Sequence, residues 1–131
     1  MMQRPYRPGQ VIILPVAAKK EIEKGAIIAL TAAGYVVDAT DTTAAKIVGR
    51  ADCAVSNLAG AAGDVTVSVF RKQAFLFTNG SGEDELKPIH LMETCYLIDQ
   101  DTVGATSDSD KRLEVGLVLE ITNEGVWVEI A

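Results

Sequence analysis

The sequence has few of the side chains that enzymes and metal sites use most. Its 131 residues include one histidine, His90, and two cysteines, Cys53 and Cys95. A single histidine excludes a metal site built on a pair of histidines. Two cysteines are too few for a disulfide framework, and these two do not form the Cys-x-x-Cys pair of zinc and redox motifs. We therefore expect no metal and no other cofactor.

Long hydrophobic runs are also missing. No apolar run reaches the ~18 residues that a membrane-spanning helix needs, and the longest, 11–18, is interrupted by Pro15. The N-terminus carries arginines but lacks the apolar stretch and small-residue cleavage site of a secretory signal. We expect a protein that does not insert into a membrane and that stays in the compartment where it is made.

Basic side chains are scarce beyond the first part of the chain. The formal net charge of −6 argues against nucleic-acid binding over the whole surface, because acidic groups repel the phosphate backbone. Residues 1–50 hold seven basic and four acidic side chains, whereas residues 51–131 hold five basic and fourteen acidic ones. This division is typical of a basic interaction arm on an acidic body, and equally of loops that differ in composition.

The first 18 residues differ in pattern from the rest. Residues 1–9 contain two prolines and a glycine without an apolar period, which predicts an extended arm with no core of its own. The β-branched run 11–14 predicts a strand at a sheet edge that ends at Pro15. We therefore divide the chain into an arm with a first edge strand, 1–18, and a single β domain, 19–131.

The arm carries the candidate contact residues. They are Arg4, Pro5, Tyr6 and Arg7. Extended main chain can add a strand to a partner's sheet, and basic side chains can pair with acidic patches. The other interpretation is a frayed terminus that contacts nothing.

Strand patterns fill most of the remaining chain. The clearest is 65–70, where valines alternate with polar or aromatic residues at a period of two. Hairpins are predicted over 26–37, with Gly34 in the loop, and over 115–130, with a turn at 122–125. In the last hairpin, the alternation places Val126, Val128 and Ile130 on one face and Trp127 and Glu129 on the other.

The sequence thus predicts a mainly β fold, a small single-domain β-barrel or sandwich of short antiparallel strands with an extended N-terminal arm. No segment has a helical period over three turns, so we expect at most one short helix, near 19–24 or 83–87. We also expect a half-buried strand over 44–56 with Cys53 facing inward, an exposed mobile loop over 79–85, a buried strand over 89–98 and a loop over 100–112.

Three segments contain residues that could carry chemistry. His90 and Cys95 are five apart, which on a strand places them on opposite faces, so a Cys–His dyad would need a sharp bend. The acidic loop 99–110 has part of the spacing of a calcium loop, but Val103 stands at a ligand position. The glycine-rich 60–63 lacks the lysine of a P-loop and leads into a strand, so we interpret it as a turn.

Three segments also carry a resemblance to a known family. They are Gly25-Ala26-Ile27-Ile28 followed by Ile47-Val48-Gly49; Gly63-Asp64-Val65-Thr66-Val67; and Cys95-Tyr96-Leu97-Ile98-Asp99-Gln100-Asp101-Thr102-Val103 followed by Val115-Gly116-Leu117-Val118 and Gly125-Val126-Trp127-Val128-Glu129-Ile130. Together they resemble the capsid decoration, or cement, proteins of tailed phages and prophages, over roughly residues 20–131. The tail is the most specific part, with a tyrosine before Asp-x-Asp-Thr-Val, a loop, a Val-Gly strand and a closing Gly-Val-Trp-Val.

The resemblance implies a non-enzymatic structural protein on the outer face of an assembled phage head. It implies the major capsid protein as partner, a homotrimer, and assembly in the cytoplasm of the bacterial host, with no cofactor and no nucleic-acid or membrane partner. Two alternatives stay open. One is a small β-barrel enzyme or ligand-binding domain that uses Cys95, His90 and the acidic loop 99–110, and the other is a head-completion or tail component of the same virion.

Deleting residues 1–9 is expected to weaken binding to expanded capsids and to leave the fold intact, because the arm has no apolar pattern to contribute to a core. Cosedimentation with empty expanded capsids measures the binding, and circular dichroism checks the fold. Unchanged binding of the truncated protein would reject the arm as a contact.

Overall fold

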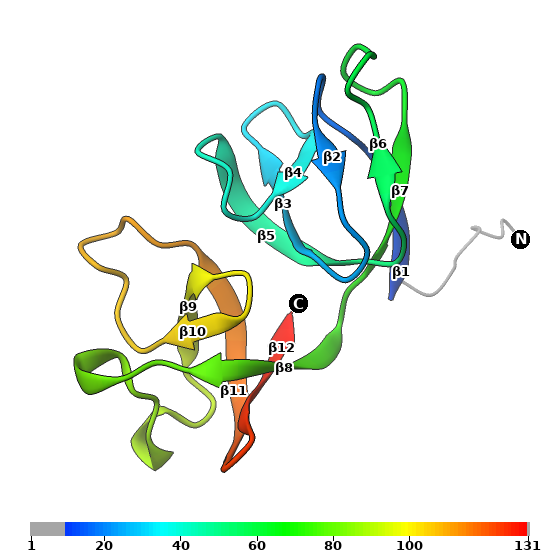
Figure 1. The fold of residues 1–131 in the computed structure, drawn as a ribbon. Helices are drawn as coiled ribbons and strands as arrows, with labels where there is room; N and C mark the ends of the chain where they lie inside the picture. The colour runs from blue at the N-terminus through cyan, green and yellow to red at the C-terminus, as the bar shows by residue number, and fades with distance from the viewer. Residues whose placement is uncertain (1–9, 131) are drawn as a thin grey trace, which may run out of the picture.

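The computed structural model describes residues 10–130, which form short strands with two 3₁₀ turns and no longer helix. The elements are β1 (Val11–Pro15), β2 (Glu21–Ile22), β3 (Ile27–Thr31), β4 (Val36–Asp38), β5 (Ala44–Ala51), β6 (Val55–Ser56), β7 (Thr66–Phe70), β8 (Gln73–Asn79), η1 (Gly82–Asp84), η2 (Pro88–His90), β9 (Thr94–Asp99), β10 (Thr102–Gly104), β11 (Glu114–Thr122) and β12 (Gly125–Ile130). The mainly β prediction is confirmed (Figure 1).

The strands up to β7 form an antiparallel sheet in the order β1-β7-β5-β3-β4, with the β2–β6 ribbon beside it. The predicted edge strand is β1, which pairs only with β7 in this sheet. The predicted hairpin is β3–β4, and Gly34 in its loop has a φ of 91°, a backbone conformation that glycine adopts without strain. Buried Val67 and Val69 of β7 pack with Ile28 and Val36 on one face of this sheet.

The later strands close into a five-stranded barrel in the order β10-β8-β12-β11-β9. Every pair in it is antiparallel except β8–β10. As predicted, Val126, Val128 and Ile130 face the core, while Trp127 and Glu129 face outward. Gly116 of β11 lies so close to the Glu129 carbonyl of β12 that any Cβ there would overlap it, so this close approach requires glycine.

The sheet and the barrel share one apolar cluster. Ile27 and Ala29 of β3 pack with Phe75 and Phe77 of β8 and with the rest of the barrel interior. The chain passes from β7 to β8 through Lys72, which has a φ of 59°, and β7 and β8 do not pair. The chain therefore crosses from the sheet to the barrel at this bend.

Gln100 fixes the seam between sheet and barrel with its side-chain amide. Its Oε1 accepts a hydrogen bond from the backbone N–H of Ile27 at 2.7 Å, and its Nε2 donates to the Ile27 carbonyl at 2.7 Å and to Asp38 Oδ1 at 2.8 Å. One side chain thus hydrogen-bonds to Ile27 as a neighbouring strand would. Close by, the Arg50 guanidinium of β5 lies 4.7 Å from the centre of the Phe75 ring of the barrel.

Several expectations were wrong. The strand over 44–56 breaks after Ala51, so Cys53 lies on an exposed bend and does not face inward. In the segment 89–98 only Thr94–Asp99 is a strand, and Ile89 is 77% exposed because it sits on the η2 turn. The segment 100–112 contains β10, since Val103 is buried and pairs with β9.

The expected short helix is also different in the structure. Segment 19–24 contains the strand β2. In segment 83–87 the helical residues are those of η1, which is one turn of 3₁₀ helix. The polar loop around η1 is largely exposed, as predicted, although Asn79 ties its two ends together with hydrogen bonds to the backbone N–H and C=O of Leu86.

Replacing Gln100 by alanine is expected to lower the free energy of unfolding by about 1–3 kcal/mol, because the N–H of buried Ile27 loses its acceptor, whereas the Ile27 carbonyl keeps the hydrogen bond from the N–H of Ala39. Urea denaturation measures the change. Gln73→Ala, at an exposed β8 position, is the control and should change stability by less than about 0.5 kcal/mol. Equal effects of the two substitutions would contradict the role of Gln100.

Candidate functional site

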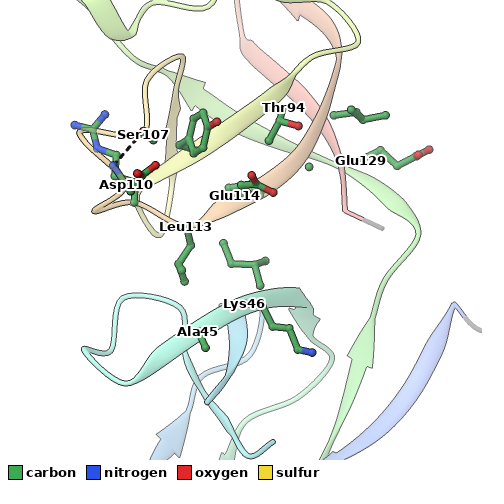
Figure 2. Close-up of a pocket in the computed structure, with 14 residues that line it drawn as sticks. Ala45, Lys46, Thr94, Ser107, Asp110, Leu113, Glu114 and Glu129 are labelled. Carbon is green, nitrogen blue, oxygen red and sulfur yellow. Dashed lines mark hydrogen bonds between the residues drawn. The ribbon is translucent and has the colours of Figure 1, made fainter. Parts of the chain in front are cut away.

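A cleft lies between β5 of the sheet and the barrel strands β9 and β11 (Figure 2). It has a volume of about 600 Å³ and carries charges of both signs. Its charged lining residues are Lys46, Asp110, Arg112, Glu114 and Glu129. Neither His90 nor Cys95 lines it. The enzyme alternative needs a cavity in which histidine and carboxylates converge, and this cleft is not such a cavity.

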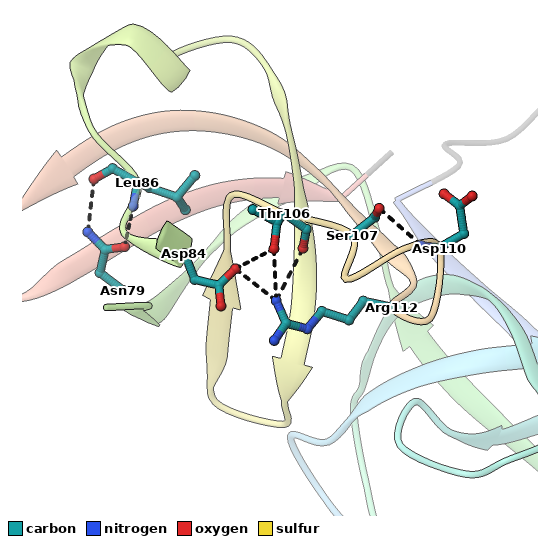
Figure 3. Close-up of polar contacts among 7 residues, drawn as sticks. All are labelled: Asn79, Asp84, Leu86, Thr106, Ser107, Asp110 and Arg112. Atoms are coloured by element: carbon teal, nitrogen blue, oxygen red, sulfur yellow. Dashed lines mark hydrogen bonds and ion pairs between the residues drawn. The ribbon is translucent and has the colours of Figure 1, made fainter. Parts of the chain in front are cut away.

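The acidic loop 99–110 is held by hydrogen bonds within the protein. Arg112 Nη1 lies 2.8 Å from Asp84 Oδ1 and also donates to the Thr106 carbonyl at 3.2 Å, and the Thr106 hydroxyl donates to Asp84 at 2.6 Å (Figure 3). These bonds from Thr106 and then Arg112 hold the pKa of Asp84 below its usual range. Asp99 accepts a hydrogen bond from the backbone N–H of Asp101.

Over residues 10–130, no three histidine, cysteine or acidic side chains come together as a set of metal ligands. The polar contacts of the loop join it to the η1 turn. We therefore interpret them as contacts that stabilise the fold. The structure likewise places 60–63 in a turn, where buried Asn57 donates to the carbonyl of Ala61.

His90 and Cys95 occupy different environments. Cys95 is buried in the barrel core, and this burial raises the pKa of its thiol to about 12. His90 lies on the half-exposed η2 turn, where its Nδ1 accepts a hydrogen bond from the backbone N–H of Lys87 at 2.9 Å. An activated thiol has a lowered pKa, so Cys95 has the opposite of the character that a Cys–His dyad requires.

The sequence-predicted contact residues lie outside the residues that the structure describes. They are Arg4, Pro5, Tyr6 and Arg7. What the structure brings together instead is a set of exposed apolar side chains on the outer surface of the barrel. We call this set the barrel band, and its members are Leu76, Met92, Leu117, Leu119 and Trp127.

Strand pairing places the members of the barrel band on neighbouring segments. Trp127 of β12 pairs directly with Leu76 of β8. On the other side of β12, Glu120 of β11 pairs with Trp127, and a bulge between Val118 and Glu120 interrupts the register at exposed Leu119. Met92 extends the band beyond β11, because its backbone N–H donates to the Val118 carbonyl at 2.7 Å.

The side chains of the barrel band are large and apolar, and each is partly exposed. Trp127 is 37% exposed and Met92 is 64% exposed, and acidic Glu120 and Glu129 stand on the neighbouring outward positions. A contiguous apolar surface with a polar rim is typical of a binding face, and tryptophan is the residue most enriched at the centres of such faces. The barrel band is therefore the candidate functional site.

Comparisons with known proteins find no family, no curated protein and no solved structure that matches this chain. In the part of the chain that the structure describes, no helix has the length and apolar content required to cross a membrane.

The two thiols are expected to differ sharply in reactivity. Cys53 is exposed, whereas Cys95 is buried with a pKa of about 12 and carries almost no thiolate near pH 8. Ellman's reagent should therefore modify one thiol per chain in the native protein and two in denaturant. In Cys53→Ser the native reaction should disappear, and a fast native reaction in that variant would contradict the burial of Cys95.

Proposed function

We propose that this protein is a capsid decoration protein, which binds the outside of an assembled phage head and stabilises the head through protein–protein contacts with the major capsid protein. The barrel band is the observation that carries the proposal, because it offers an apolar contact surface around Trp127. The motifs of the sequence that resemble decoration proteins run through the same strands, in particular the closing Gly125-Val126-Trp127-Val128 of β12.

The size of the barrel band suits a role that depends on many copies. A few large side chains, each partly exposed, supply a modest contact free energy per molecule. On the repeating surface of a capsid, decoration proteins that also contact one another bind cooperatively. Their combined avidity for the capsid then exceeds the affinity of any single contact. The acidic residues around the band favour a partner surface that is apolar at its centre and basic at its rim.

The rest of the described chain is consistent with such a role. In the acidic loop, the Asp99 carboxylate accepts a hydrogen bond from the backbone N–H of Asp101, and the Thr106 hydroxyl donates to Asp84 of η1. The buried thiol of Cys95 has a raised pKa. The N-terminal arm, with Arg4 and Arg7, would add a second and basic contact beside the acidic body.

Leu119→Glu is expected to reduce binding to empty expanded capsids at least tenfold at sub-saturating concentration, because it replaces an exposed apolar side chain of the barrel band by a second charge next to Glu120, in a surface that must lose water on binding. Electron microscopy of decorated capsids counts the bound copies. Leu58→Glu is the matched control, since Leu58 is 56% exposed and lies in the turn after β6, in the half of the chain that forms the sheet.

The control should bind as the wild type does. Equal binding of both variants would reject the barrel band as the capsid contact, and no binding of the wild-type protein to expanded capsids would reject the proposed function.

A further inference from the structure

The cleft between β5 and the barrel carries negative charge that residues 10–130 do not balance. Of its five charged lining residues, only Arg112 forms an ion pair within the described chain, and its partner, Asp84, belongs to η1. The other four are one lysine and the three carboxylates of Asp110, Glu114 and Glu129. One positive and three negative charges leave the cleft with an uncompensated charge of −2.

The cleft also has an apolar lining. Ile47 of β5 stands on the sheet side, and Tyr96 of β9 and Leu113 before β11 stand on the barrel side, all three half-buried. At about 600 Å³ the cleft has room for a short peptide segment. Its chemistry suits a segment that combines positive charges with an apolar or aromatic side chain.

The described chain begins close to one end of this cleft. The Gln10 carbonyl accepts a hydrogen bond from the N–H of Arg71, and the N–H of Lys72 donates to the carbonyl of Ile130, the residue after Glu129. Consecutive Cα atoms lie ~3.8 Å apart, and those of hydrogen-bonded residues on paired segments ~5.5 Å apart. This series of contacts places Gln10 within about 20 Å of Glu129.

The nine residues before Gln10 are long enough to follow the cleft and have the matching charge. An extended chain spans ~3.3–3.6 Å per residue, so this segment reaches about 30 Å. Its sequence is Met-Met-Gln-Arg-Pro-Tyr-Arg-Pro-Gly, with two positive charges and no negative one. Its two prolines restrict the unbound backbone, so the segment loses less conformational entropy when it binds.

We propose that residues 1–9 bind in the cleft of their own chain. The guanidinium groups of Arg4 and Arg7 pair with the free carboxylates of the cleft, and the Tyr6 ring contacts its apolar lining. Guanidinium–carboxylate pairs are among the strongest hydrogen-bonded contacts in proteins. The bound arm then covers the seam between sheet and barrel from outside.

This inference goes beyond the proposed function and does not depend on it. It concerns the protein in solution, before any capsid is bound, and the measurement therefore needs no capsids. Because each arm stays within its own chain, the inference is compatible with the homotrimer that the sequence resemblance implies.

A spin label on the arm measures where the arm lies. In a chain with Gln3→Cys and Cys53→Ser, a maleimide spin label attaches to residue 3, while buried Cys95 stays unlabelled. The amide NMR signals of the ¹⁵N-labelled protein should broaden strongly along the cleft, for example at Tyr96, and not at Leu58 in the turn after β6. A lack of preferential broadening along the cleft overturns the proposal.

Charge variants test the ion pairs. Glu114→Gln combined with Glu129→Gln should lower the paramagnetic relaxation rate of the Tyr96 amide at least threefold, because two of the three free carboxylates are lost. Glu83→Gln combined with Glu124→Gln is the matched control, which removes the same charge from exposed positions outside the cleft and should leave the rate unchanged. Equal rates in the two double variants contradict the proposed ion pairs and overturn the proposal.

A mixed sample tests whether the arm binds its own chain. Spin-labelled protein without ¹⁵N is combined in denaturant with ¹⁵N-labelled protein without a spin label, and the two are refolded together. The cleft signals should then keep their widths, because each ¹⁵N-labelled cleft holds an unlabelled arm. Broadening as strong as in the first sample would assign the cleft to the arm of a neighbouring copy and overturn binding within one chain.

Discussion

The apolar cluster shared by the sheet and the barrel is the contact on which the rest of the structure depends. β3 contributes Ile27 and Ala29 from the sheet, and the barrel contributes its whole interior, so this cluster is complete only when both halves are in place. The burial of apolar area itself has no direction. Hydrogen bonds do have a direction, and the side-chain amide of Gln100 bonds to both the N–H and the C=O of Ile27. These two bonds fix how the sheet is oriented on the barrel.

Local sequence patterns predicted the fold where a strand keeps its period of two. β7 and the β11–β12 hairpin were recognised because valine alternation and the turn at 122–125 coincide in the structure. The predictions failed where the backbone leaves that period. Cys53 follows the break after Ala51, and Met92 has a φ of 65°, and both are exposed.

The candidate site could be predicted only in part from the sequence, because a strand period gives the direction of a side chain but not its neighbours on other strands. The outward direction of Trp127 follows from the alternation of β12. Its neighbours in space do not follow, because Leu76 pairs with it across β8–β12, and a bulge in β11 sets which residue of that strand stands opposite it. Pairing partners and bulges depend on the closure of the barrel as a whole, and no local pattern encodes them.

The order of the strands along the chain has a consequence for synthesis on the ribosome. The sheet uses strands only up to Phe70, so it can form as soon as that part has emerged, whereas the barrel waits for β12 at the end of the chain. During that interval Ile27 and Ala29 have no barrel to cover them. The nascent chain therefore presents a bare apolar sheet face, and it is most exposed to aggregation before its last strand is made.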